Sequence, residues 1–440
     1  MNETAPPMAF EPRIVAFVCK WCTYAGADLA GTSRMTYAPN VRTLMLPCTG
    51  RIDVSFVMRA FLDGADGVIV SGCHPGDCHY TAGNYRARRR WMLFRDLLNV
   101  IGFDLDRFEV AWISAAEGAK WVKTIQAFTD KILALGPHDA MRRLGDGAAD
   151  FAPANGAAAF RFEPARPANP QLAAAVGEAF TGGKVKVVAG WIRNETFSRP
   201  RPSWILSADE AGSLVAPGDS GNLARLLKNP KLKALLPLGL VARRSEVSSL
   251  NVLAQENQID PAKIVIFAVA DDGKFLGTMD LASASAALLH ELPADRPVGF
   301  SEATLKALDE LMAKLPAERL TFWLEQSVKC IKCYACRGSC PMCGCEQCFT
   351  DRNQPQWFPT AGDGRGNFSW HLLRAFHLAG RCVGCGSCTN ACPAGIPLDL
   401  LNAAMARSAR QHFNHRAGVD SSGAPLQSDY LQNDKEDFIL

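Results

Sequence analysis

Two cysteine runs near the C-terminal end of this 440-residue chain share one spacing, and each ends in a proline. The runs are Cys330-x2-Cys333-x2-Cys336-x3-Cys340-Pro341 and Cys382-x2-Cys385-x2-Cys388-x3-Cys392-Pro393. Three thiolates on one tight loop can bind three irons of a [4Fe–4S] cube, and the fourth, placed before proline, binds the neighbouring cube. The repeat therefore predicts two [4Fe–4S] clusters.

Each predicted ligand set combines the two runs, because the fourth cysteine of each run crosses to the other cluster. The first cluster is expected on Cys330, Cys333, Cys336 and Cys392. The second is expected on Cys382, Cys385, Cys388 and Cys340. Zinc also binds CxxC pairs, but zinc sites do not require the cysteine before proline that occurs here twice. The spacing is that of bacterial two-cluster ferredoxins, so we expect an α+β dicluster ferredoxin-like module.

Three further cysteines lie between the two runs, namely Cys343, Cys345 and Cys348. One interpretation is an extra metal site completed by His371 or His377. The preferred interpretation is a cysteine-rich insertion that shields the clusters. The long gap between Cys340 and Cys382 also requires an inserted loop or helix.

Residues 13 to about 136 alternate short apolar runs with longer amphipathic stretches. The runs rich in Val, Ile and Leu, typical of buried parallel strands, are Arg13–Val18, Arg42–Leu46, Gly67–Val70 and Phe108–Ile113. The stretches with helical length and periodicity are Ser55–Asp63, Ala82–Ile101 and Ala115–Leu135. This alternation predicts an α/β domain with a flavodoxin-like, doubly wound parallel sheet.

Five cysteines occur in this N-terminal region: Cys19, Cys22, Cys48, Cys73 and Cys78. Cys19, Cys48 and Cys73 each follow the end of a predicted strand, and the carboxyl ends of parallel strands face one crevice. Four converging thiolates suit a [2Fe–2S] cluster or zinc, and the fifth cysteine is spare. The alternative is a set of buried, reduced cysteines that bind no metal. Five cysteines at three strand ends make this the weaker interpretation.

Composition limits the class of protein. Hydrophobic residues make up 48% and charged residues 21%, so packed cores can form. The net charge of +3 gives no electrostatic reason to expect nucleic acid as a partner. No cysteine lies between Cys78 and Cys330, whereas disulfide frameworks spread their cysteines through a domain. With no signal peptide or transmembrane segment in the pattern, we expect a reduced, cytoplasmic protein.

The length predicts about three domains at roughly 150 residues each. The expected divisions are a [2Fe–2S] domain over 1–137, an Ala/Pro/Gly-rich linker over 138–183, an α/β scaffold or docking domain over 184–326, a two-[4Fe–4S] module over 327–414 and a mobile tail over 415–440. In the middle domain, the predicted strands are Val185–Ile192, Leu235–Val241 and Lys263–Val269, and the predicted helices are Val247–Gln258 and Ser301–Leu315.

The N-terminal motifs resemble a known family. FVCKWCTYAGADLAG, LPCTGRID, DGVIVSGCHPGDCHYTAGN and ISAAEGAKW are similar to the delta subunit of methyl-viologen-reducing hydrogenase. The resemblance implies one [2Fe–2S] cluster on four of the five N-terminal cysteines. It also implies a relay between a hydrogenase or formate dehydrogenase and the flavin subunit of heterodisulfide reductase.

A second resemblance covers the chain from about residue 184. LGLVARRSEVSSLNVLAQENQIDPAKIVIFAV and CIKCYACRGSCPMCGCEQCF are similar to iron–sulfur beta subunits of deazaflavin-coenzyme hydrogenases and formate dehydrogenases. Such proteins usually have Gly-Cys-Asp where this chain has Ala242-Arg243-Arg244, and a cysteine pair before Cys330 is missing. We therefore expect a scaffold or docking role here, with FAD binding the less favoured interpretation.

Electron transfer is the function that joins these parts. The chain shows no nucleophile–base pair or paired carboxylates, so we expect a subunit that is not catalytic alone. It would relay low-potential electrons between a hydrogenase, formate dehydrogenase or ferredoxin and a heterodisulfide-reductase-like flavoprotein. The alternatives are a flavin-containing iron–sulfur oxidoreductase with its own soluble substrate and, less favoured, a zinc-binding assembly scaffold.

Overall fold

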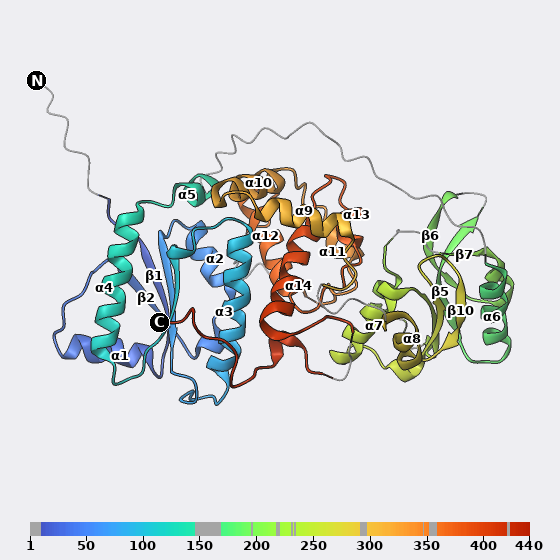
Figure 1. Ribbon diagram of the computed structural model, residues 1–440, viewed down its shortest axis with the longest axis horizontal. Helices are drawn as coiled ribbons and strands as arrows, with labels where there is room; N and C mark the ends of the chain where they lie inside the picture. Colours follow the sequence, from blue (N-terminus) through green and yellow to red (C-terminus); the bar gives the residue numbers. More distant parts are fainter. Residues whose placement is uncertain are drawn as a thin grey trace, which may run out of the picture.

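The computed structural model describes ten segments of the chain. These are residues 10–145, 169–194, 197–216, 221–229, 232, 235–290, 297–345, 347–351, 359–419 and 423–440. Two β-sheets stand at opposite ends of the molecule, and the C-terminal helices lie between them (Figure 1). The cysteine-rich part of the chain is therefore enclosed by the two parts that precede it in sequence.

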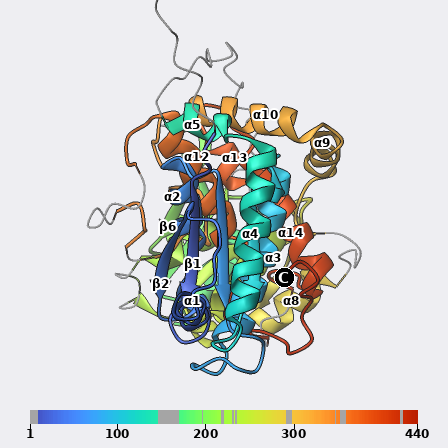
Figure 2. The ribbon, with the colours of Figure 1, turned by 90° about the vertical axis from the view of Figure 1, so that its left-hand side faces the viewer.

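The first sheet consists of four parallel strands in the order β2-β1-β3-β4. The strands are β1 (Ile14–Cys19), β2 (Val41–Leu46), β3 (Gly67–Gly72) and β4 (Phe108–Trp112). Helices α1 (Thr23–Thr32) and α4 (Gly118–Leu135) contact one another on one face, and α2 (Val54–Leu62) and α3 (Gly83–Val100) pack on the other (Figure 2). The predicted α/β class, four strands and three helices are confirmed.

Helix α1 was not predicted, because its sequence TYAGADLAGT has few large apolar residues. Close backbone approach explains this composition. A Cβ on Gly26 would lie 2.8 Å from the carbonyl oxygen of Ser114, so the helix packs against the loop after β4 through small residues.

The second sheet is mixed. Its strands are β5 (Val187–Asn194), β6 (Phe197–Ile205), β7 (Leu214–Val215), β8 (Leu238–Ala242), β9 (Ile264–Val269) and β10 (Phe275–Met279). Strands β5, β8 and β9 are parallel, as the three predicted runs indicate, while β6, β7 and β10 pair antiparallel. The edge strand β6 was missed because Pro200 and Pro202 argue against a strand, although an edge tolerates proline.

Three helices pack with the second sheet in one core: α6 (Pro170–Thr181), α7 (Arg244–Gln255) and α8 (Leu281–Leu289). The predicted linker over 138–183 is described only at its two ends. Helix α5 (Asp139–Gly145) forms one end, and α6 forms the other and buries Leu172 and Val176 against the second sheet. The intervening residues 146–168 lie outside the described part of the chain.

The C-terminal part is helical. Its elements are α9 (Glu302–Met312), α10 (Pro316–Val328), α11 (Ala335–Ser339), α12 (Gly364–His377), α13 (Ser387–Asn390) and α14 (Leu398–Phe413). Within the described residues from 327 to 414 there is no strand, so the α+β expectation for this module is corrected. No helix in the described part of the chain is both long and apolar enough to cross a membrane.

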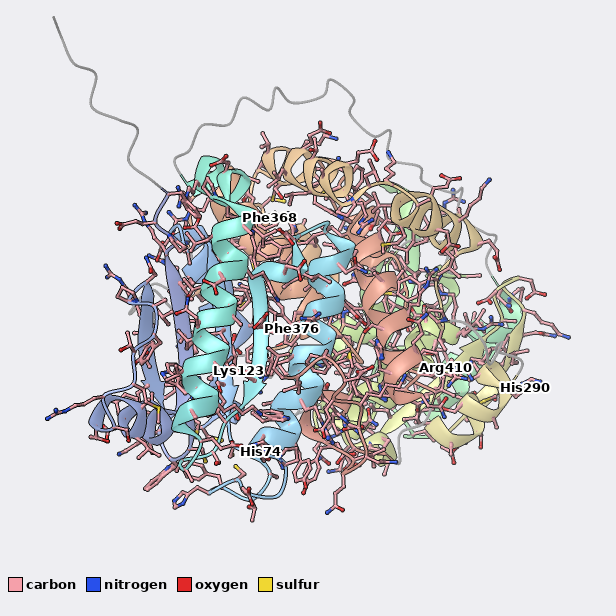
Figure 3. All side chains as sticks on the ribbon, turned by 60° about the vertical axis from the view of Figure 1, so that its left-hand side comes forward. His74, Lys123, His290, Phe368, Phe376 and Arg410 are labelled. Atoms are coloured by element: carbon pink, nitrogen blue, oxygen red, sulfur yellow. The ribbon has the colours of Figure 1, made fainter. Side chains whose placement is uncertain are left out.

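The parallel-sheet domain and the C-terminal helices share one hydrophobic core. Phe368 and Phe376 on α12 belong to this core, and Phe376 meets Phe94 of α3 edge-on at 6.3 Å (Figure 3). Helices α9 and α10, expected in the middle domain, also pack here through Leu308 and Trp323. The C-terminal helices therefore pack directly against the N-terminal domain.

The last residues do not form the mobile tail expected over 415–440. The described residues 426–440 run along α3, where buried Arg88 donates to the carbonyl oxygens of Leu431 at 2.7 Å and Gln432 at 3.1 Å. Leu440 exchanges backbone hydrogen bonds with Val110 and Trp112 of the edge strand β4. The polar composition of this segment predicted a mobile tail, because the arginines of α3 that bind the segment are distant in sequence.

Removal of the Arg89 side chain is expected to destabilise this packing. Arg89 donates to Asp434 at 2.6 Å, and the two side chains are 5% and 4% exposed. Arg89→Met leaves a buried carboxylate unpaired, which costs about 3–5 kcal/mol. The matched change Arg86→Met, at an exposed position of the same helix, should cost no more than about 0.5 kcal/mol. Urea denaturation of both variants checks this, and equal midpoints would contradict it.

Candidate metal centres

The five N-terminal cysteines lie at the carboxyl edge of the parallel sheet, the end marked by His74 in Figure 3. Cys19 ends β1, Cys48 lies two residues beyond β2, and Cys73 directly follows β3. Cys22 precedes α1, and Cys78 lies in the loop before α3. Adjacent parallel strands bring their carboxyl ends to one crevice, as the sequence predicted.

The thiols approach one another at this edge. Cys48, Cys73 and Cys78 form one buried cluster with half-buried Cys22 packed against it. The sulfurs of Cys48 and Cys78 are 3.7 Å apart. Cys19 interacts through its thiol with Cys48 and Cys73, so all five cysteines belong to one site.

Nearby donors and aromatic rings surround this cluster. The Asn84 amide donates to the Cys73 sulfur at 3.6 Å, and the Gly50 backbone N–H donates to the Cys48 sulfur at 3.4 Å. His74 pairs with Glu117 at 2.7 Å, and this pair, after the Ser114 backbone N–H, lowers the pKa of Glu117 to about 2. His79 stacks on Trp21 with ring centroids 3.9 Å apart. Both histidines therefore have partners outside the thiol cluster.

One pocket of the C-terminal module brings together a complete predicted ligand set. Its lining includes Cys330, Cys333, Cys336 and Cys392, and the space measures about 310 Å³ with its open mouth included. Trp370 and His371 of α12 complete the wall next to Pro393 and Leu398. The fourth cysteine of the second run thus joins the first three cysteines of the first run.

The second predicted set lies beside this pocket. Cys382, Cys385 and Cys388 interact electrostatically with Cys340, the fourth cysteine of the first run. Cys340, Cys382 and Cys385 pack against the core of the second sheet, whereas Cys388 packs with Cys336. The two sets are neighbours, and the middle domain covers part of the second one.

Both cysteine loops have the same backbone conformation. In the first loop, Lys332 and Tyr334 have φ of 54° and 57°, and in the second, Gly384 and Gly386 have φ of 68° and 66°. These residues flank the second cysteine of each run, Cys333 or Cys385. Non-glycine residues rarely adopt left-handed φ, and a cost of about 1–3 kcal/mol is tolerated mainly at functional sites. The two loops are therefore a structural repeat as well as a sequence repeat.

The three intervening cysteines differ in their packing. Cys343, like Cys340, Cys382 and Cys385, packs against the core of the second sheet, and Cys348 packs with the residues around the first pocket. Cys345 is exposed. His371 lines the first pocket, and the ring of His377 meets Phe349 edge-on at 5.1 Å.

In the part of the chain that the structure describes, no three His, Cys, Asp or Glu side chains converge as ligands of one metal ion. Each thiolate of a [4Fe–4S] cube binds its own iron, so the ligands of such a cluster surround a volume instead of meeting at one atom. The cysteine-lined pocket has this arrangement.

Burial raises the pKa of several thiols. It raises the pKa of Cys22 to about 11, of Cys336 to about 11 and of Cys385 to about 12. These shifts follow because a buried thiolate loses its hydration. Metal ligands must be deprotonated, so binding of a metal at these sites releases protons.

The metal-free protein is therefore expected to lose stability at alkaline pH. Its raised thiol pKa values favour the folded state below the ordinary pKa near 9.0, and this advantage is lost as pH rises toward 11–12. Each such thiol should lower the free energy of unfolding by about 1.4 kcal/mol per pH unit in that range. Urea midpoints from pH 8 to 10.5 test this. The metal-loaded protein is the control, and constant midpoints without metal would contradict the expectation.

Comparison with known proteins identifies the family of the N-terminal domain. Residues 14–136 match the family described as methyl-viologen-reducing hydrogenase, delta subunit. An iron-sulfur subunit of the F420-non-reducing hydrogenase vhc of Methanococcus voltae is 52% identical over 128 residues, which are 29% of this chain and 89% of that protein. Through this domain, the chain belongs to the methyl-viologen-reducing hydrogenase delta-subunit family.

Other relatives match the delta-subunit domain in different settings. An iron-sulfur subunit of the F420-non-reducing hydrogenase of Archaeoglobus profundus is 47% identical over 128 residues, 29% of this chain and 93% of that protein. One subunit of the ferredoxin/F(420)H(2)-dependent CoB-CoM heterodisulfide reductase of Methanosarcina acetivorans is 44% identical over 126 residues, 29% of this chain but only 16% of that protein. The delta-subunit domain thus occurs both alone and as part of a larger protein.

Two residues beside the C-terminal cysteines were not predicted from the sequence. Asn402 donates to the Cys388 sulfur at 3.5 Å, and Arg374 donates to the Cys336 carbonyl oxygen at 3.2 Å. Both are buried polar residues on α12 and α14, outside the two cysteine runs. Polar residues within the apolar faces of α12 and α14 were the only signal that could have found them.

Proposed function

We propose that this protein is an iron–sulfur electron-transfer subunit. It relays low-potential electrons between a hydrogenase, formate dehydrogenase or ferredoxin and a heterodisulfide-reductase-like flavoprotein in the cytoplasm. The observation that carries the proposal is the meeting of Cys330, Cys333, Cys336 and Cys392 in one pocket beside the second cysteine run. The same chain holds a delta-subunit domain with its own cysteine site.

The residues fit two [4Fe–4S] clusters in the C-terminal module and one [2Fe–2S] cluster in the N-terminal domain. All the donors are thiols, and backbone or amide N–H groups point at several of them. Lys332 donates its backbone N–H to the Cys330 sulfur at 3.4 Å, as Asn402 does with its amide to Cys388. Such N–H···S hydrogen bonds fix the ligands and stabilise negative charge on sulfur.

A cluster bound at each site supplies one-electron transfer at a potential that ligands, hydrogen bonds and solvent exposure determine. The protein holds the thiols in place, excludes water and fixes the sites relative to one another. The shared core of α3, α12 and α14 does this between the N-terminal and C-terminal sites. The middle domain packs against Cys340, Cys382 and Cys385, which supports a scaffold role for it.

The relatives support the choice of partner. In the Methanosarcina acetivorans protein, the matching domain is part of a heterodisulfide reductase subunit. The same domain is fused to a larger protein in one case and belongs to a separate chain in another. Such a domain commonly interacts with the same partner protein in both cases. The iron-sulfur relatives from F420-non-reducing hydrogenases support a hydrogenase as the other partner.

The test is the metal and cofactor content of anaerobically purified protein. We expect about ten irons per chain with matching acid-labile sulfide, and EPR signals of interacting clusters after reduction with dithionite. Zinc without sulfide would overturn the proposal in favour of an assembly scaffold. Stoichiometric flavin alongside the iron would favour an oxidoreductase with its own substrate.

A further inference from the structure

A buried histidine faces the first cysteine pocket without a hydrogen-bond partner. His371 is 7% exposed, and among the described residues neither of its ring nitrogens has a hydrogen-bond partner. Buried polar atoms are almost always paired, so an unpaired imidazole requires an explanation. It lines the pocket formed by Cys330, Cys333, Cys336 and Cys392.

The chemistry of this pocket supplies the missing partner. A neutral imidazole carries one N–H in either tautomer. Thiolate and sulfide sulfurs of a cluster accept hydrogen bonds, and such bonds raise the reduction potential because the reduced cluster carries more negative charge. Trp370, the neighbouring residue on α12, already interacts with the Cys336 thiol, whereas His371 does not have such a partner among the described residues.

A buried cation lies one turn further along the same face of α12. Arg374 is 4% exposed and donates to the Cys336 carbonyl oxygen at 3.2 Å, while its Nε has no partner among the described residues. Its electrostatic partners are the thiols of Cys388 and Cys340 of the second set, of Cys343 between the two runs, and of Cys336 of the first set. Ion pairs in the described part of the chain include none between Arg374 and a carboxylate. Among the described residues, the cysteine sites are the groups that can supply its counter-charge.

We propose that His371 and Arg374 set the reduction potentials of the two C-terminal clusters. His371 donates a hydrogen bond to the first cluster only, and Arg374 acts as a shared cation between the two. The inference rests on the proposed function, because it requires both clusters. Arg374 then raises the reduction potentials of both clusters, and His371 raises the potential of the first cluster further.

The histidine is tested by a potentiometric titration of the holoprotein followed by EPR. His371→Phe should make reduction of the first cluster about tenfold less favourable. For a one-electron couple, this lowers the midpoint potential by about 59 mV. The second cluster should keep its potential. His371→Asn retains an N–H donor and should restore most of the shift. Unshifted potentials in a His371→Phe protein with full iron content would overturn the role of the histidine.

The arginine is tested in the same way. Arg374→Met should lower both midpoint potentials, and Arg374→Lys should lower them less. Arg365→Met is the matched control, since it removes a charge from the same helix at a residue that pairs with Asp63. A shift confined to one cluster, or an equal shift in the control, would overturn the shared role.

A measurement on the wild-type protein tests the inference even if the variants fail to assemble their clusters. Pulsed EPR of the reduced wild-type protein labelled with ¹⁵N-histidine should show weak nitrogen coupling to one [4Fe–4S] cluster, and absence of that coupling would overturn the inference. A wild-type protein without iron and sulfide would overturn the proposed function as well. Intact clusters with unshifted potentials would overturn this inference alone.

Discussion

Replacing Cys388 with alanine is expected to convert the second cluster to a 3Fe form or abolish it, and to slow electron transfer by more than about 100-fold. Cys388 is buried, accepts a hydrogen bond from Asn402 and packs with Cys336 between the two cysteine sets. Loss even of the residues that support metal ligands costs roughly 10–100-fold, so loss of a ligand should cost more. Iron and sulfide analysis with EPR of the reduced protein measures the change.

The matched control is Cys345→Ala, which removes an exposed cysteine of the same module. It should keep about ten irons and the interacting signals of two [4Fe–4S] clusters. The signal of the N-terminal site should persist in both variants, because its five cysteines belong to a separate domain. A Cys388→Ala protein with two intact [4Fe–4S] clusters and undiminished electron transfer would contradict the ligand assignment.

The sequence predicted the parallel-sheet domain closely because its signals are local. Buried strands such as Gly67–Gly72 read as continuous apolar runs, and the positions of Cys19, Cys48 and Cys73 follow directly from the strand ends. Helix α1 escaped prediction because its packing depends on small residues such as Gly26, which carry no amphipathic pattern. Periodicity detects apolar faces and does not detect close backbone approach.

The arrangement of the C-terminal module could not be predicted in the same way. Residue spacing predicted that Cys392 joins the first run, and in the structure Cys392 lines the same pocket as Cys330, Cys333 and Cys336. The helical frame and the packing of α9 and α10 on the N-terminal domain depend on contacts between distant residues. The pair Arg89–Asp434, for example, spans 345 positions of sequence. An arginine-rich helix is normally a solvated face, and only the docked C-terminal segment explains why Arg88 and Arg89 are buried.

His371 shows what residue spacing alone leaves open. One interpretation of the sequence, not the preferred one, made His371 or His377 a ligand of an extra site with Cys343, Cys345 and Cys348. In the structure, His371 lies in the wall of the first pocket. The only sequence signal for Arg374, three positions further along the same helix, was a charged residue within the apolar face of α12.

Substitution of Gly83 by alanine is expected to remove metal from the N-terminal site without unfolding the domain. Gly83 begins α3, and a Cβ there would lie 2.3 Å from the Cys48 sulfur and 3.1 Å from the Cys78 sulfur. A free thiol can rotate away from such a methyl group. A thiolate fixed as a metal ligand cannot, so the clash acts on the loaded site. Gly83 has no positive φ, so alanine is compatible with its backbone conformation and should cause no general loss of stability.

The measurement is iron content and the EPR signal of the N-terminal site in Gly83→Ala, compared with Gly31→Ala. Gly31 lies in α1 of the same domain, and a Cβ there meets nothing within 4 Å. The Gly31 variant should retain its full iron, whereas the Gly83 variant should lose about two irons per chain while both C-terminal clusters remain. Full iron and an unchanged signal in Gly83→Ala would show that Cys48 is not held as a ligand in the position seen here. Cys48 would then be the spare cysteine, and the four-thiolate site would consist of Cys19, Cys22, Cys73 and Cys78.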